Sequence, residues 1–230
     1  MKMKYIIFDF DGTIGDSKGL IVRTFQDTMH KIGREVKSEQ ECAGTIGMRL
    51  SEAFSLLYHS SKEDGEACAE VYRGIFEENK SKMGMKMFPH VEETIRELYS
   101  RGFLMAVASS RGRESLCELL AQMRLSEYMS SIVAQEDVKH VKPAPDMVYR
   151  ALGEMAGRRM VESEIHTLND ELRDMAADTL VIGDMAFDVE MAHNAGAKAC
   201  AVTYGNGTRA QLSDAEWLID DFGEILEKLK

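Results

Sequence analysis

Short apolar runs alternate with amphipathic helical stretches along most of this sequence, and this alternation limits the choice of fold more than any other feature. The apolar runs have the length and composition of buried strands; they are residues 4–8, 103–108, 131–134, 179–182 and 197–202. Between them, apolar residues recur at every third or fourth position, which is typical of one helix face. Strands that alternate with helices form parallel sheets with right-handed crossovers. We therefore predict an α/β fold with a Rossmann-like parallel sheet.

A long helical block separates the first predicted strand from the other strands. Across residues 17–84 the apolar spacing is helical, and the stretch contains no proline. The pattern predicts a core formed by residues 1–14 and 87–230, with an α-helical domain inserted at residues 15–86. A charged stretch at residues 154–177 predicts a surface helix or a helical hairpin. The chain is expected to end in an amphipathic helix.

Composition excludes several classes of protein. A net charge of −11 over 230 residues argues against binding to a nucleic-acid backbone, which needs clustered lysines and arginines. No apolar run approaches the roughly 18 residues of a membrane span, and the apolar start is too short for a secretory signal. The four cysteines have no CxxC spacing, which favours reduced thiols over a zinc or redox site. We expect a cytoplasmic protein without nucleic-acid or membrane partners.

Reactive polar residues follow four of the predicted strands, directly or in the loop beyond. They are Asp9, Asp11, Ser109, Ser110, Lys142, Asp184 and Asp188. Each has an ordinary explanation when taken alone, namely a helix cap for the aspartates and serines and a solvated charge for the lysine. In open α/β sheets, however, ligands bind beyond the carboxyl ends of the strands. Because all of these residues follow such ends, the sequence predicts one common ligand site.

The residue types at this site suit phosphoryl transfer. Asp9 and Asp184 can together hold Mg²⁺, a cation that prefers oxygen ligands. Asp9 would be the nucleophile, and Asp11, two residues later, can protonate the leaving oxygen and then activate water. Ser109 and Lys142 would bind the remaining phosphoryl oxygens. These roles predict a phosphatase or a related phosphoryl-transfer enzyme.

Residues 9–17, Asp-Phe-Asp-Gly-Thr-Ile-Gly-Asp-Ser, resemble the DxDGTxxDS signature of the haloacid dehalogenase superfamily. The later motifs follow in the matching order: a serine after the second core strand, a lysine before Pro-x-Pro-Asp, and Gly-Asp-x₃-Asp. The resemblance spans essentially the whole chain, and it identifies the inserted helical domain as a cap. It implies Asp9 as nucleophile and Asp11 as acid and base. The metal ligands that it implies are Asp9, Asp184 and the main-chain carbonyl of Asp11.

The same resemblance implies a phosphate-binding role for Ser109, its neighbour Ser110, and Lys142. Asp188 would contribute indirectly, through a water molecule or by orienting Lys142. Arg49 belongs to a glycine-containing cap loop, and such loops read the leaving group of the substrate in this superfamily. The alternative for Arg49 is an exposed residue at the start of a helix.

Within the superfamily, residues 183–192 and 199–207 are similar to phosphoglycolate-phosphatase-like proteins. Ser109-Ser110-Arg111 departs from the Thr-Asn-Lys that this group often has, and the connection at residues 154–177 is longer than usual. The sequence thus predicts a Mg²⁺-dependent phosphatase that hydrolyses a small phosphorylated metabolite, phosphoglycolate first, through an aspartyl phosphate. The alternatives are a β-phosphoglucomutase-like phosphomutase, a pyrophosphatase or nucleotidase, and, least favoured, a non-catalytic binding protein. The sequence does not indicate an oligomeric state.

Overall fold

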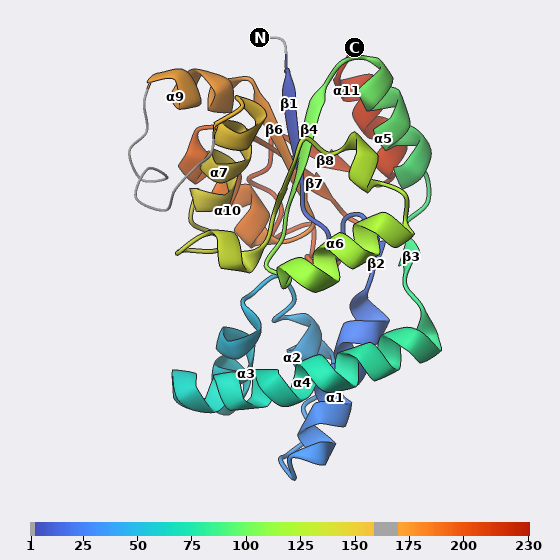
Figure 1. Cartoon of the computed structure of the whole chain (residues 1–230), viewed down its shortest axis with the longest axis vertical. Helices are drawn as coiled ribbons and strands as arrows, with labels where there is room; N and C mark the ends of the chain where they lie inside the picture. Colours follow the sequence, from blue (N-terminus) through green and yellow to red (C-terminus); the bar gives the residue numbers. More distant parts are fainter. Residues whose placement is uncertain (1–2, 159–169) are drawn as a thin grey trace.

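The structure is a computed structural model that describes residues 3–158 and 170–230. Its centre is a parallel six-stranded sheet with the strand order β5-β4-β1-β6-β7-β8 (Figure 1). The strands are β1 (Tyr5–Phe8), β4 (Leu104–Ala108), β5 (Ser131–Val133), β6 (Thr179–Gly183), β7 (Lys198–Val202) and β8 (Trp217–Ile219). The first strand lies in the middle of the sheet, so its carboxyl end has neighbours on both sides. The predicted α/β fold class is confirmed.

Helices cover both faces of this sheet, because alternate side chains of each strand point to opposite faces. In β1, Ile7 packs with one buried cluster, whereas Ile6 and Phe8 pack with the other. The first face carries α7 (Asp146–Met155), α9 (Asp170–Ala177) and α10 (Ala186–Ala195). The second carries α5 (Val91–Ser100), α6 (Arg113–Gln122) and α11 (Ile225–Lys228). Single turns of 3₁₀ helix lie at η1 (Ser126–Tyr128), η2 (Gln135–Asp137) and η3 (Phe222–Glu224).

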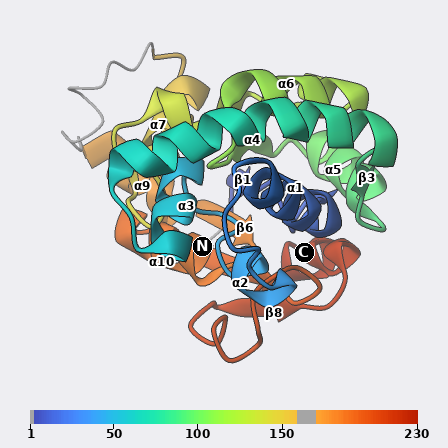
Figure 2. The same ribbon diagram turned by 90° about the horizontal axis from the view of Figure 1, so that it is seen from below.

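The inserted segment forms a separate group of helices beyond the carboxyl ends of the strands (Figure 1). It contains α1 (Lys18–Lys31), α2 (Glu39–Ala43), α3 (Leu50–Tyr58) and α4 (Lys62–Met83). These helices share their own apolar cluster, in which the ring of Phe25 lies 4.9 Å from that of Phe54 and 5.0 Å from that of Tyr72. Seen from below, α4 runs across the core (Figure 2). We keep the name cap for residues 15–86.

Two short strands connect the cap to the core. The chain enters the cap through β2 (Gly15–Asp16) and leaves it through β3 (Lys86–Met87), and the two pair in antiparallel fashion. The four cap helices lie inside the predicted insertion, and the exact domain boundaries stay a prediction. The two connecting strands and β8 were not predicted. The expected terminal helix is a 3₁₀ turn followed by the four residues of α11.

The charged stretch at residues 154–177 is only partly described. Helix α7 ends at Met155 and α9 begins at Asp170, while residues 159–169 lie outside the described part of the chain. A helix was predicted for this stretch, and α9 forms one over its last eight residues, Asp170–Ala177. Within the described residues, no helix combines the length and the apolar character needed to cross a membrane.

Candidate active site

The residues expected at the strand ends meet at one edge of the sheet, facing the cap. Asp9 directly follows β1, Ser109 directly follows β4, and Asp184 directly follows β6. Because β1 pairs with both β4 and β6 in parallel register, these three carboxyl ends lie next to each other. Lys142 reaches the same place from the loop before α7. The topology therefore explains why residues far apart in sequence form one site.

Three buried carboxylates form the centre of this site. Carboxylate oxygens of Asp9, Asp184 and Asp188 lie within 4.8 Å of one another. Burial raises the pKa of Asp9 well above its usual range, despite the opposing charge of Lys142. Burial, with the negative charge of Asp188, raises the pKa of Asp184 to about 7. Such close negative charges favour a bound cation, since each ionised carboxylate disfavours the next.

Lys142 supplies one positive charge to this cluster. Its ammonium group pairs with Asp9 and, at 2.7 Å, with Asp188. Burial works against the charged lysine, but Asp188 and Asp9 outweigh it and raise the pKa of Lys142. The lysine is therefore fixed as a cation beside the predicted nucleophile. Its contact with Asp188 agrees with the orienting role expected for that aspartate.

Asp184 is held by a loop that the sequence analysis did not assign to the site. The main-chain NH of Asn206 donates to Asp184 Oδ2 at 2.6 Å, and the side-chain amide of Asn206 donates to the same oxygen at 2.8 Å. Gly12 leaves the room for this contact: it has a φ of 90°, and a Cβ there would lie 2.2 Å from Asp184 Oδ2. The signal for Asn206 was its position between two glycines after β7, which is typical of a tight turn.

Asp11 is bound by an arginine that the sequence analysis noted only as a departure from the family pattern. Arg111 Nη2 lies 2.5 Å from Asp11 Oδ1, and Arg111 Nε donates to Asp11 Oδ2 at 3.1 Å. The guanidinium carbon also lies 4.8 Å from the ring centre of Phe76 in α4. Burial opposes the charge of Arg111, but Asp11 outweighs it and raises the pKa of the guanidinium. Arg111 thus links the predicted acid to the cap.

The two predicted phosphate-binding serines differ in their contacts. Ser109 Oγ accepts a hydrogen bond from the main-chain NH of Arg111 at 3.2 Å. Ser110 Oγ is buried and has no hydrogen-bond partner among the described residues. A buried hydroxyl without a partner is costly, and a ligand oxygen would remove that cost. Both serines line the same cavity as Asp9 and Asp11.

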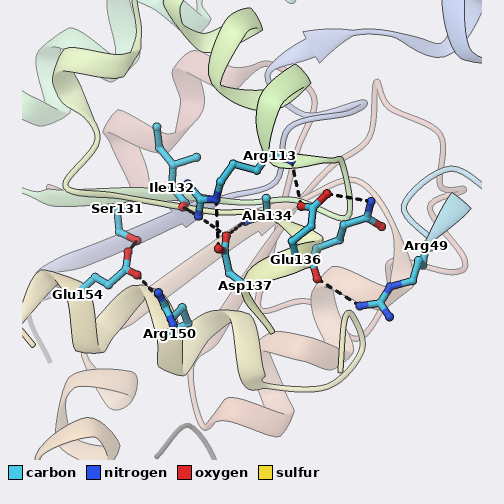
Figure 3. Close-up of polar contacts among 10 residues, drawn as sticks. Arg49, Arg113, Ser131, Ile132, Ala134, Glu136, Asp137, Arg150 and Glu154 are labelled. Carbon is cyan, nitrogen blue, oxygen red and sulfur yellow. Dashed lines mark hydrogen bonds and ion pairs between the residues drawn. The ribbon is translucent and has the colours of Figure 1, made fainter. Parts of the chain in front are cut away.

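This cavity lies between the core and the cap and has a volume of about 460 Å³. Arg49 does not line it. Arg49 lines a neighbouring cavity of about 370 Å³, and its Nη2 donates to the main-chain oxygen of Gln135 at 3.2 Å (Figure 3). The structure thus brings together the predicted residues of the core and leaves Arg49 beside them. Leu50, the next residue, lines both cavities.

The donor set suits a hard divalent cation. Asp9, Asp184 and Asp188 offer only carboxylate oxygens, without a histidine or cysteine in the described cluster. Oxygen-only donors favour Mg²⁺ or a similar ion over zinc or copper. The raised pKa values of Asp9 and Asp184 point the same way, because a cation would offset the repulsion that raises them. The residues therefore fit the expected metal.

Comparison with known proteins agrees with this geometry. The family model of the haloacid dehalogenase-like hydrolases matches residues 6–202. The "Probable phosphatase IndB" of Dickeya dadantii is 30% identical over 96% of this chain and 91% of its own length. The pyrophosphatase PpaX of Bacillus mycoides is 26% identical over 98% of this chain and 96% of its own.

Solved structures share the fold. A predicted phosphatase from Clostridium acetobutylicum superposes with a TM-score of 0.81 at 23% identity, covering 100% of this chain and 99% of that one. A predicted phosphoglycolate phosphatase from Haemophilus somnus gives a TM-score of 0.79 at 22% identity, with the same coverage. At these identities the two structures support the fold alone. Together with the family match, the strand-end motifs lead to one conclusion: the chain is an enzyme that belongs to the haloacid dehalogenase-like hydrolases.

Proposed function

We propose that this protein is a Mg²⁺-dependent phosphatase that acts on a small phosphorylated metabolite through an aspartyl phosphate on Asp9. The observation that carries the proposal is the single cavity lined by Asp9, Asp11, Ser109 and Ser110, with Lys142 in contact with Asp9. These groups supply a nucleophile, an acid and base, and donors for phosphoryl oxygens. The names of the phosphatase and pyrophosphatase relatives support the same class of reaction.

In the first step, a carboxylate oxygen of Asp9 attacks phosphorus, and the bond from phosphorus to the alcohol oxygen breaks. Asp11 gives its proton to that oxygen, so the alcohol leaves as a neutral molecule. Asp11 is paired with Arg111 in the structure, so this contact must loosen before Asp11 can reach the leaving oxygen. Lys142 and the hydroxyl groups of Ser109 and Ser110 hold the other phosphoryl oxygens.

In the second step, water attacks the phosphorus of the aspartyl phosphate. Asp11, now ionised, takes a proton from that water, and the bond from phosphorus to Asp9 breaks. Phosphate leaves, and both carboxylates return to their starting state. The pair with Arg111 suits this step, because it holds the carboxylate of Asp11 in a fixed position.

Asp9, Asp184 and the main-chain carbonyl of Asp11 would hold the metal, with Asp188 behind them. When bound, Mg²⁺ supplies charge screening between the Asp9 carboxylate and the phosphate dianion.

The four cysteines are free thiols, which supports a cytoplasmic location.

Two substrates follow from similarity. Phosphoglycolate comes from the sequence resemblance. Diphosphate comes from the relatives named PpaX, which are 25–26% identical over nearly the whole chain. A phosphomutase would keep the phosphoryl group on the enzyme or pass it to a second substrate, so release of free phosphate separates that alternative from hydrolysis.

The test is phosphate release from a panel of phosphate esters and diphosphate, with Mg²⁺ and with a chelator. We expect release with Mg²⁺, none with the chelator, and none from Asp9→Asn, because an amide is a poor nucleophile and a poor metal ligand. Asp214→Asn, at an exposed position, is the matched control and should keep full activity. Activity of a few per cent or more in Asp9→Asn, without deamidation, would move the nucleophile elsewhere.

A further inference from the structure

The half of the cavity that belongs to the cap is mainly apolar. Its apolar side chains include Ile21, Phe25, Ile46, Leu50, Tyr72 and Phe76. Tyr72 adds no charge, because burial raises the pKa of its phenol. Thr45, a polar neighbour on the same wall, already donates its hydroxyl to the main-chain oxygen of Cys42 at 2.8 Å. The leaving group of a substrate would therefore meet mostly carbon atoms.

The arginines that line the cavity already have acidic partners. Arg73 contacts Glu66 and Glu70, each at 2.7 Å. Arg113 pairs with Asp137 (Figure 3). The carboxylate partners offset part of each arginine's charge, so a second anion gains less from these arginines than from unpaired ones.

The remaining charges near the leaving group also disfavour an anionic leaving group. Arg111 is paired with Asp11, and the core side of the cavity adds two carboxylates, Glu114 and Glu136. Arg49, the arginine expected to meet an anionic leaving group, faces the neighbouring cavity. A carboxylate or second phosphate on the leaving group would thus find acidic and apolar surroundings.

The size of the cavity allows more than a two-carbon leaving group. A volume of about 460 Å³ lies within the range of pockets that hold ligands the size of a drug. A phosphoryl group beside Asp9 and Ser109 leaves room for a ring against Phe25 and Phe76. Small anionic substrates such as phosphoglycolate would leave most of this apolar surface without contact.

We propose that the physiological substrate is a phosphate monoester of an uncharged, apolar alcohol of about the size of a single ring with a short linker. This inference rests on the proposed phosphatase function and names its substrate class. The phosphoryl group would bind at Asp9, Ser109 and Lys142, and the alcohol portion would lie against α1, α3 and α4.

The experiment compares kcat/KM for three esters of unactivated primary alcohols: 2-phenylethyl phosphate, ethyl phosphate and phosphoglycolate. All three leaving groups are primary alcohols that depart in the same protonated form, so the comparison reports recognition rather than reactivity. We expect 2-phenylethyl phosphate to exceed ethyl phosphate about 10- to 60-fold, as burial of a phenyl group predicts. We expect phosphoglycolate to be no better than ethyl phosphate.

A variant tests whether the cap side of the cavity binds the alcohol portion of the substrate. Leu50→Arg adds a cation to the wall at a half-buried position. It should lower kcat/KM for 2-phenylethyl phosphate about 10-fold and raise that for phosphoglycolate about 10-fold. Leu56→Arg, on the same helix with 52% of its surface exposed and outside the cavity, is the matched control and should change neither value. Met48→Arg replaces Leu50→Arg if circular dichroism shows that the latter is unfolded.

The outcomes separate the two proposals. Equal rates for 2-phenylethyl and ethyl phosphate, or a preference for phosphoglycolate or diphosphate, would overturn the apolar substrate while leaving the phosphatase intact. Absence of phosphate release from every ester with Mg²⁺ would instead overturn the phosphatase function itself.

Discussion

At the scale of single residues, the pair of Asp11 and Arg111 is the feature with the clearest consequences. Only 12% of the Asp11 side chain and 8% of the Arg111 side chain are exposed. A buried ion pair of this kind adds little net stability, but removal of one partner leaves an uncompensated charge. The pair therefore acts mainly to fix where Asp11 lies.

We predict that Arg111→Met lowers the free energy of unfolding by about 3 kcal/mol, because Asp11 is then buried without its partner. Asp11→Asn in the same chain should recover at least about 1 kcal/mol of that loss. Urea unfolding of the two single variants and the double variant gives this coupling directly. Strictly additive effects would show that the two side chains do not depend on each other.

The predicted site residues are those whose role depends on a position after a strand. Asp9, Ser109 and Asp184 each follow a buried strand directly, and a parallel sheet brings such positions together. The sequence could not reveal the partner of Asp11, since Arg111 lies 100 positions away and the contact depends on a side-chain orientation. For the same reason the sequence could not show that Arg49 lines the neighbouring cavity, and its contact with substrate stays a prediction.

At the scale of elements, α4 reaches the core through an ion pair at its C-terminal end. Lys80, near its end, pairs with Glu77 at 2.6 Å and with Glu118 of α6 at 2.5 Å. The pair with Glu118 joins a helix of the cap to a helix of the core. Glu118 is about half exposed, so this contact is worth at most about 1 kcal/mol and weakens in salt.

We predict that Lys80→Met raises KM about two- to fivefold at low ionic strength, because a cap that closes less firmly holds substrate less well. Wild-type KM should rise towards the variant's value as salt is added. Lys82→Met, at an exposed position of the same helix, is the control and should leave KM unchanged. A KM for Lys80→Met equal to that of the wild type at all salt concentrations would remove the pair from cap closure.

The elements that the sequence analysis missed are short. The strands β2 and β3 have two residues each, which is too few for a periodic pattern, and the three residues of β8 lie between the charged residues Glu216 and Asp220. They form because neighbouring strands offer hydrogen-bond partners, and that condition lies in the tertiary structure. The longer strands and helices carried enough apolar positions to be recognised locally.

At the scale of the whole molecule, the buried carboxylates couple stability to pH and to metal. The pKa of Asp184 is about 7 in the folded protein, against an ordinary value near 4, so the folded state holds more protons between these pH values. Without metal, the contribution of Asp184 to stability is therefore greatest below about pH 4 and falls as pH rises to about 7. Metal binding opposes this loss, because it requires the ionised carboxylates.

We predict that Asp184→Asn stabilises the metal-free protein relative to the wild type by about 2 kcal/mol more at pH 7.5 than at pH 5. Mg²⁺ should raise the Tm of the wild type more at pH 8 than at pH 5, and should have little effect on the variant. Urea unfolding in chelator and thermal unfolding with Mg²⁺ measure the two effects. The opposite pH trend in either would contradict the assignment.

The pairing of β2 with β3 has a consequence for how such a protein can evolve. The chain leaves the core after Ile14 and returns at Phe88, and the main-chain NH of Phe88 donates to the oxygen of Ile14 at 3.0 Å. From the side of the sheet, the entire cap is thus equivalent to one surface loop with adjacent ends. Insertions, deletions or exchange of that loop need not alter the spacing of β1 and β4. Selection can accordingly change which molecules are recognised without rebuilding the groups that perform the reaction.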